Sequence, residues 1–355
     1  MHKRIWITGA AGFVGSSVAL YLKELWPNLE IAALDNLRRR GSELNLPRLK
    51  AAGIPFFHAD IRCLEDLTSV SVQPDLILEC SAEPSVLAGY NSSPEYLIQT
   101  NLTGCFNCLE MARRNRADFL FVSTSRVYPV KLLNQLAWEE SATRFELTDP
   151  QAVPGASSHG IAEDFPLEGT RSLYGMTKLS AEMMIEEYSE AYGFRYIVDR
   201  CGLLTGPWQM ATSEQGVVAQ WVAWHHFGKP LRYIGFGGNG KQVRDFLHIA
   251  DFCELIADQI SHFDSYSSRR WNVGGGRANS LSLREATGLC GQITGRPQQV
   301  ASSTDQRPAD LRIYITDHRR VSAVHGWKPK RDADRTLTDI YEWIRSHEDA
   351  LRQVL

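Results

Sequence analysis

The sequence predicts an α/β fold built on a doubly wound parallel sheet, with a smaller α/β lobe beside it. Short apolar runs bounded by turn or charged residues alternate with segments long enough for crossover helices. Parallel strands joined by such crossovers form a sheet with helices on both faces. A glycine-rich turn directly after the first run supports the same reading.

Six of the apolar runs are interpreted as buried parallel strands: 4–8, 30–35, 55–60, 75–80, 118–124 and 194–200. After about residue 203 the alternation weakens, and 246–260 and 270–276 are expected to return to the sheet. We therefore expect a first domain of residues 1–203 plus about 246–278. The second lobe should comprise about 204–245 and 279–355.

Composition excludes several classes of protein. A net charge of -3 and a pI near 6.4 give no general attraction to nucleic acid or anionic lipid. No apolar stretch approaches the roughly 20 residues of a membrane span, and the first residues lack the apolar core of a signal peptide. Seven irregularly spaced cysteines suggest reduced thiols in a cytoplasmic protein.

Neither a metal site nor glycosylation is expected. The pairs Cys105/Cys108 and His225/His226 lack further ligands at metal-binding spacing, so helix packing explains them better. The sequons at Asn91 and Asn101 should carry no glycan, because nothing indicates secretion.

The first functional motif is "TGAAGFVGSSVA". Its glycines, Gly9, Gly12 and Gly15, follow a predicted strand and precede a helix, where a diphosphate can approach the helix N-terminus if side chains are absent. Asp35 lies twenty residues beyond Gly15 at the end of the second strand, where a carboxylate can bind ribose hydroxyls. The two parts in register predict a dinucleotide-binding domain rather than an ordinary glycine turn.

Asp35 also favours NAD over NADP, because a carboxylate would repel a 2'-phosphate. The arginines at 38–40 argue weakly for NADP, since a guanidinium there could accept that phosphate.

The second motif is "SLYGMTKLSAEMM", which is expected to be helical from about Tyr174. Tyr174 and Lys178 then lie at i and i+4 on one face. An ammonium beside a phenol favours phenolate, which can take a proton from a sugar alcohol. Because this spacing is common on solvated helices, it carries weight only with the nucleotide fold upstream.

The segment "STSRVYP" at 123–129 places hydroxyls where a central strand ends, and open α/β sheets bind ligands at that edge. Thr124 can share a substrate oxygen with Tyr174. For at least one of the neighbouring serines, turn chemistry at the strand end is the simpler explanation.

Together these motifs resemble the extended short-chain dehydrogenase/reductase family of nucleotide-sugar epimerases and dehydratases. "TGAAGFVG", "HADI", "STSRVY", "YGMTK", "GNGKQVRDFLHIAD" and "NVGGG" fall in the family's order from end to end. The resemblance implies a Rossmann fold, NAD as cofactor, a nucleotide-diphosphate-sugar substrate and a homo-oligomer, dimer or tetramer. It gives the catalytic roles to Thr124, Tyr174 and Lys178.

The resemblance also implies two sets of binding residues. Those expected at the cofactor, besides Tyr174 and Lys178, are Gly9, Gly12, Phe13, Val14, Gly15, Asp35, Asn36, Asp60, Ile61, Ser81, Ala82 and Asn101. Those expected at the substrate are Ser125, Arg126, Cys201, Gln209, Gln215, Gly216, Arg244 and Arg307.

The two residues after the catalytic hydroxyl report the reaction within this family. Dehydratases carry an acid pair there, whereas this chain has Ser125 and Arg126, and arginine cannot lose its proton near neutral pH. The long insert before Tyr174 and segments such as "STDQR" resemble, more narrowly, the CDP-tyvelose (CDP-paratose) 2-epimerases. A nucleotide-sugar 4-epimerase, another nucleotide-sugar oxidoreductase and a non-catalytic NAD-binding regulatory protein stay open as alternatives.

The segment "GFGGNGKQ" from Gly235 matches a phosphate-binding loop only superficially. Gln242 replaces the serine or threonine that would bind magnesium, and no strand and helix flank the loop. By the family resemblance, Arg244 instead approaches the substrate diphosphate, with Arg307 as a second clamp; surface salt bridges are the alternative, above all for Arg307.

Overall fold

The computed structural model of the chain describes residues 2–90, 92–212 and 215–355, so the sequon at Asn91 lies outside it. The chain divides into two compact units. Unit 1 contains Met1–Thr124, Leu173–Arg200 and Phe252–Trp271, and unit 2 contains Ser125–Ser172, Cys201–Asp251 and Asn272–Leu355.

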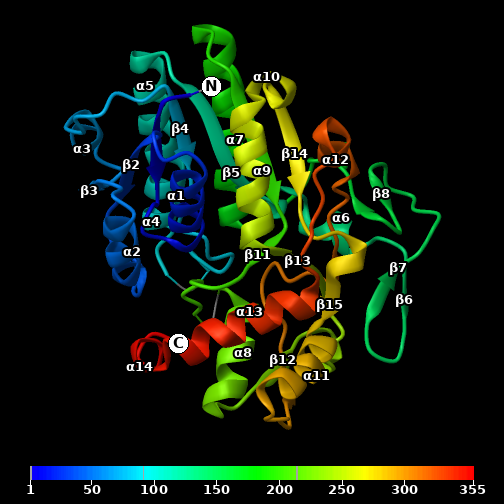
Figure 1. The fold of residues 1–355 in the computed structure, drawn as a ribbon. Helices are drawn as coiled ribbons and strands as arrows, with labels where there is room; N and C mark the ends of the chain where they lie inside the picture. The colour runs from blue at the N-terminus through cyan, green and yellow to red at the C-terminus, as the bar shows by residue number, and fades with distance from the viewer. Residues whose placement is uncertain (1, 91, 213–214) are drawn as a thin grey trace. The chain divides into compact units, whose positions relative to one another are not determined.

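A seven-stranded parallel sheet forms the centre of unit 1, with the strand order β14-β10-β5-β4-β1-β2-β3 (Figure 1). The six predicted strands are confirmed, and β14 supplies the seventh. The chain reverses its direction of winding between β1 and β4, and open sheets bind ligands beside such a switch point. The strands are β1 (Arg4–Thr8), β2 (Glu30–Asp35), β3 (Phe56–His58), β4 (Leu76–Glu79), β5 (Asp118–Thr124), β10 (Tyr196–Cys201) and β14 (Arg269–Val273).

Helices pack on this sheet through the apolar side chains that its strands present. Trp6, Ile77 and Phe119 form one buried cluster with residues of two long helices, α5 and α7. Among the described residues, no helix is both long and apolar enough to cross a bilayer. The helices here are α1 (Phe13–Leu25), α2 (Leu46–Ala51), α3 (Leu64–Thr68), α4 (Glu95–Ile98), a π-helix (Gln99–Thr103), α5 (Gly104–Asn115), α7 (Leu173–Tyr192), α9 (Ile249–Ser261) and α10 (Phe263–Tyr266), with a 3₁₀ turn (Ser42–Asn45).

Unit 2 is built on a smaller sheet in the order β11-β13-β15, with β17 also paired to β13. Its remaining strands form three two-stranded pairs. The strands are β6 (Trp138–Glu140), β7 (Phe145–Leu147), β8 (Ala156–Ser157), β9 (Gly160–Ile161), β11 (Leu203–Thr205), β12 (Arg232–Ile234), β13 (Val243–His248), β15 (Ser280–Ser282), β16 (Ala301–Ser303) and β17 (Ile313–Tyr314).

The helices of unit 2 include a packed set of three, α8, α11 and α13. Ser282 caps α11 through a reciprocal pair of hydrogen bonds with Glu285, which satisfies two otherwise unpaired donors. The helices are α6 (Val130–Asn134), α8 (Val217–Phe227), α11 (Leu283–Thr294), α12 (Arg319–His325), α13 (Ala333–Ser346) and α14 (Glu348–Leu351), with 3₁₀ turns at Ser125–Val127, Phe236–Gly238 and Arg277–Asn279.

Residues 246–260 were expected to return to the large sheet. The part from Phe252 onward lies in unit 1, but residues 246–248 do not join the large sheet. Strand β13 belongs to the smaller sheet, where it pairs with β11 and β17 in parallel and with β15 in antiparallel register. Hydrogen bonding on both edges leaves β13 no free edge for the large sheet.

The insert between Tyr128 and Tyr174 belongs to unit 2, although we expected it in the first domain. The backbone N–H of Phe145 donates to Lys241 O at 3.1 Å, and that of Ile161 donates to Ile315 O at 2.8 Å. Because these partners lie in unit 2, that unit includes Ser125–Ser172, and unit 1 resumes at Leu173 and ends again at Arg200, close to the expected residue 203.

Candidate active site

The glycine turn between β1 and α1 is shaped by backbone contacts. Gly9 has a φ of +63°, and a Cβ on Gly15 would lie 2.3 Å from the carbonyl oxygen of Gly9. Side chains at either position would strain or block the turn. Phe13 and Val14 follow in the first turn of α1, beside the N-cap Gly12. This cradle fits a dinucleotide diphosphate at the N-terminus of α1, which is the group that the sequence predicts.

Asp35 is fixed at the end of β2 beside this turn. Its carboxylate accepts the backbone N–H of Ala11 at 3.0 Å and that of Leu37 at 2.8 Å. Burial raises the pKa of Asp35, while these backbone hydrogen bonds act in the opposite direction. The two contacts fix the orientation of the carboxylate at the end of β2.

Asn36 and Asp60 link the ends of β2 and β3. The Asn36 amide donates to Asp60 at 3.0 Å, and Arg62 binds both Asp60 oxygens. Burial would raise the pKa of Asp60, but the hydrogen bonds from Arg62 and Asn36 outweigh it and bring the value to about 2. Asp60 is therefore ionised at neutral pH. Ile61 beside it is buried.

The arginines at 38–40 interact within the protein. The guanidinium of Arg38 lies 4.0 Å from the centre of the Tyr96 ring. Arg39 is half-buried, and burial lowers its pKa while the charge of Glu83 opposes that shift. These two interactions weaken the argument for a 2'-phosphate.

Asn101 occupies the π-helix at Gln99–Thr103, a rare conformation that is common at functional sites. It accepts the backbone N–H of Glu83 at 2.8 Å, and its amide donates to Thr177 on α7 at 3.1 Å. Ser81 and Ala82 lie in the loop between β4 and Glu83. Asn101 thus ties this loop to the helix that carries Tyr174.

Three predicted catalytic residues lie buried in unit 1. Thr124 ends β5, while Tyr174 and Lys178 are one helical turn apart on α7. Their exposed fractions are 8% for Thr124, 8% for Tyr174 and 3% for Lys178. A lysine so deeply buried needs a counterion or another compensating contact.

Sequence reasoning missed that counterion, which is Glu79 at the end of β4. Its carboxylate lies 3.9 Å from Nζ of Lys178, and both side chains are almost fully buried. The signal was present as the charged Glu79 that directly follows the apolar residues of the run "DLILEC".

The residues expected at the substrate lie in unit 2. Arg126 donates to the carbonyl oxygen of Ala309 at 2.9 Å, and Ser125 beside it is buried. Gln209 accepts from Thr205 at 2.8 Å and donates to Leu204 O at 3.1 Å. Cys201 is buried at the end of β10; Gly216, with a φ of +78°, precedes α8, and Gln215 precedes Gly216.

Arg244 projects from β13 and is held in place. Its guanidinium donates to Leu311 O at 2.8 Å and lies 3.3 Å from the Asp310 carboxylate. Burial lowers the pKa of Arg244, whereas Asp310 raises it. These contacts orient Arg244, and Arg307 is exposed in the loop before β17.

Gln242 and the pair His225/His226, for which we expected no phosphate or metal binding, make contacts within the protein. Gln242 donates to Ile234 O at 2.7 Å within the glycine-rich segment. His225 pairs with Trp221 O at 2.8 Å along α8, and His226 lies 3.2 Å from Glu348.

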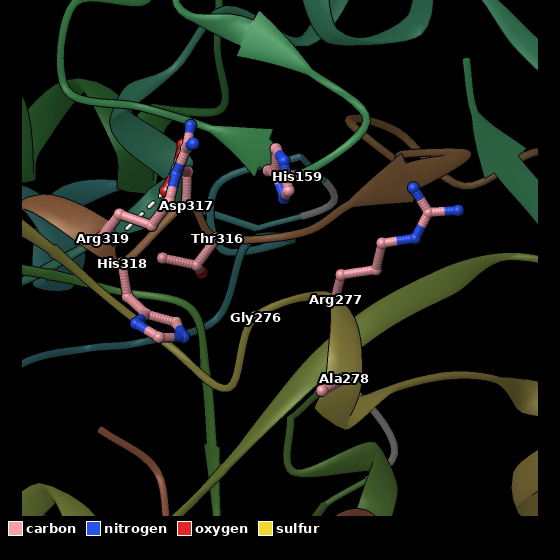
Figure 2. A pocket seen from close by; sticks show the side chains of 8 residues that line it. All are labelled: His159, Gly276, Arg277, Ala278, Thr316, Asp317, His318 and Arg319. Atoms are coloured by element: carbon pink, nitrogen blue, oxygen red, sulfur yellow. Dashed lines mark hydrogen bonds and ion pairs between the residues drawn. The ribbon is translucent and has the colours of Figure 1, made fainter. Parts of the chain in front are cut away.

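Unit 2 also has a hollow of about 430 Å³ that no motif predicted (Figure 2). Its lining includes His159, Arg277, His318 and Arg319. Arg319 binds both Asp317 oxygens, and Arg277 lies 3.3 Å from Glu146. Because both guanidinium charges are already offset, we assign no anion to this hollow.

The chain is similar to known enzymes along nearly its whole length. It is 28% identical to the CDP-paratose 2-epimerase of Salmonella typhi, over 97% of this chain and 99% of that protein. It is 27% identical to the dTDP-glucose 4,6-dehydratase of Mycolicibacterium smegmatis, over 97% and 94%. The fold matches UDP-glucose 4-epimerase of Thermotoga maritima, with a TM-score of 0.79 at 24% identity, over 97% of this chain and 99% of that one.

A family model agrees with the fold and with the glycine cradle. The model of the NAD dependent epimerase/dehydratase family matches residues 5–274, which span the sequence from β1 to the end of β14. The chain therefore belongs to the NAD-dependent epimerase/dehydratase family, whose cofactor is NAD.

Proposed function

We propose that this protein is a nucleotide-sugar epimerase that inverts a carbinol carbon by transient oxidation. The observation that carries the proposal is a proton-transfer set without a dehydratase's acid pair. Thr124, Tyr174 and Lys178 are retained and buried, while Ser125 and Arg126 follow Thr124. The full-length similarity to a CDP-paratose 2-epimerase supports the same reaction class.

The cofactor would be held by the glycine cradle at Gly9–Gly15 and by Asp35. When bound, NAD supplies an acceptor that can return the same hydride to the opposite face of the keto-sugar. Asn101 supports the site by fixing the loop after β4 to α7.

The protein's own contribution is proton transfer. Tyr174 takes the proton of the sugar hydroxyl, and the nearby Lys178 ammonium stabilises the phenolate. The Thr124 hydroxyl orients the same oxygen. After the sugar presents its other face, Tyr174 returns the proton to that oxygen.

Dehydration is disfavoured by the chemistry of the residues after Thr124. Removal of water from a keto-sugar needs an acid and a base beside the reacting carbons. Arg126 cannot act as a base, and its guanidinium donates to the Ala309 carbonyl. Similarity to dehydratases therefore indicates shared ancestry, and the reaction that we assign is epimerisation.

The proposed substrate is a CDP-linked sugar, with inversion at carbon 2. The similarity to the Salmonella enzyme supports this choice. Arg244 would pair with the diphosphate, since a planar guanidinium can bind two oxygens, and the exposed Arg307 would add a second contact. We further propose that the enzyme acts in the cytoplasm as a homo-oligomer.

A substrate screen tests this function. Purified protein with NAD would be incubated with CDP-, UDP-, GDP- and dTDP-sugars, and the products would be identified by NMR. We expect a 2-epimer from a CDP-sugar. A 4-epimer would retain the mechanism and change the carbon, whereas no turnover with intact NAD binding would favour a regulatory protein.

A further inference from the structure

Each member of the buried ion pair Glu79–Lys178 makes one further contact, Glu79 with Thr8 and Lys178 with the Phe121 ring. Glu79 accepts from the Thr8 hydroxyl at 3.4 Å, and its exposed fraction is 1%. Nζ of Lys178 lies 3.9 Å from the Glu79 carboxylate and 3.9 Å from the centre of the Phe121 ring. The ammonium is therefore held by a carboxylate on β4 and an aromatic face on β5.

Glu79 is a costly residue in its place. The three other residues of β4 are buried and apolar, so a fourth apolar side chain would suit the core. Moving a carboxylate out of water costs several kcal/mol, which an ion pair often does not recover. Burial raises the pKa of Glu79, and the charge of Lys178 opposes that rise. Stability alone does not explain a carboxylate at this position.

The titratable groups near the pair are three thiols and Asp199, a buried aspartate on β10 that also acts on Cys80 and whose pKa burial raises to about 7. Cys80 follows Glu79, and Cys105 and Cys108 lie on α5; burial raises the pKa of each thiol. Thr8 and Phe121 carry no charge, and Tyr174 precedes Lys178 by one turn of α7. Glu79 is the carboxylate that the structure places in ion-pair contact with Lys178.

We propose that Glu79 is a positioning residue, which holds the Lys178 ammonium and offsets part of its charge, and so sets the pH at which Tyr174 ionises. The inference rests on the proposed roles of Tyr174 and Lys178. The carboxylate need not touch substrate. Its negative charge disfavours a second negative charge on the phenol, and its ion pair fixes the position of the ammonium.

The test is a spectroscopic titration of Tyr174 in the NAD-loaded protein. The difference in tyrosinate absorbance between a protein and its Tyr174→Phe counterpart isolates this one tyrosine. Glu79→Gln keeps the side-chain shape and removes the charge, so the Tyr174 midpoint should fall by about one pH unit. Glu79→Asp, which keeps the charge, should move it less. Glu79→Met removes the charge without burying an amide and replaces the glutamine variant if that one does not fold.

The matched control is Glu110→Gln on α5. Glu110 pairs with Arg113 at 2.8 Å in the same unit, so this variant also loses an ion pair of unit 1, but not the one with Lys178. Its Tyr174 midpoint should equal that of the wild type. A folded Glu79→Gln or Glu79→Met protein with an unchanged midpoint would refute the inference.

Turnover gives an independent readout. The rise of kcat with pH should move to lower pH in Glu79→Gln, because the phenol ionises at lower pH once the carboxylate charge is removed. If the wild-type protein turns over no nucleotide sugar, the proposed function is refuted, and the Tyr174 titration still tests the role of Glu79. If the wild type epimerises its substrate normally and the Tyr174 midpoint is unchanged in Glu79→Gln, only the inference about Glu79 is refuted.

Discussion

Ser123 donates a 2.6 Å hydrogen bond to Glu182, deep within unit 1. The same carboxylate accepts from Arg200 at 2.7 Å, and the three side chains are at most 4% exposed. Successive side chains of a strand point to opposite faces, so Thr124 is directed away from this network. Two adjacent hydroxyls on β5 thus serve different purposes.

Substitution of these two hydroxyls should separate stability from turnover. Ser123→Ala leaves a buried carboxylate one partner short and should lower the free energy of unfolding by about 1.5–3 kcal/mol, with kcat nearly unchanged. Thr124→Val should lower kcat and leave stability nearly unchanged. Urea unfolding and steady-state kinetics of both variants measure this, and the reverse pattern would mean that the roles are exchanged.

Tyr174→Phe should lower turnover by about 10²–10⁴-fold, because that is the usual value of general-base assistance. The cofactor content should stay near that of the wild type, since the glycine cradle is untouched. Quantification of bound NAD after denaturation gives the control. A variant within a few-fold of wild-type activity would contradict the assignment of the base.

Arg244→Ala should weaken nucleotide-sugar binding far more than NAD binding. The guanidinium is already oriented by Asp310 and Leu311, so its loss would remove the contact that we propose to the diphosphate. Calorimetry with each ligand measures the two affinities. Equal losses for both ligands would point to a structural role for Arg244.

Deuterium at the epimerised carbon should remain in the product. A hydride that leaves and returns through the cofactor does not exchange with water, and Arg126 provides no base to remove a carbon-bound proton. NMR of the product, with a parallel reaction in heavy water, reports the label. Solvent deuterium at carbon would indicate enolisation and would end the transient-oxidation proposal.

Stability should fall with rising pH because of Asp199. Burial raises the pKa of Asp199 from 3.8 to about 7, although the Gln259 amide donates to it at 2.8 Å. Between these values the unfolded chain releases the proton and the folded protein retains it, so the free energy of unfolding falls as pH rises. Each unit of pKa difference is worth about 1.4 kcal/mol.

Asp199→Asn keeps an acceptor for Gln259 and removes the titration. The free energy of unfolding of the wild type minus that of Asp199→Asn should therefore fall between pH 4 and pH 7. Denaturant unfolding at several pH values measures this difference. A constant difference would show that Asp199 stays ionised in the folded protein.

The large sheet could be predicted from sequence because its strands are continuous apolar runs. The seven-residue run at β5 and the glycine turn after β1 both depend on local patterns. Strand β13 was placed in the wrong sheet because its partners, β15 and β17, are distant in sequence and only three and two residues long. Such short strands carry too little periodicity to reveal their pairing.

The site residues show the same contrast between local patterns, which sequence reveals, and contacts between distant segments, which it does not. The i, i+4 spacing of Tyr174 and Lys178 is local, so the helix alone places them on one face. Glu79 and Lys178 are 99 positions apart, and their pairing depends on how β4 and α7 pack. Asn101 and Thr177 are 76 positions apart, and no spacing rule predicts their hydrogen bond.

The insert at 129–172 is joined to the rest of unit 2 through backbone hydrogen bonds, which place few demands on its side chains. Ile161 donates its backbone N–H to Ile315 O and accepts that of Asp317 at 2.9 Å. Peptide groups make these contacts, and they persist through most changes of side chain. Relatives could therefore vary the exposed residues of this segment extensively while its backbone contacts to the rest of unit 2 persist.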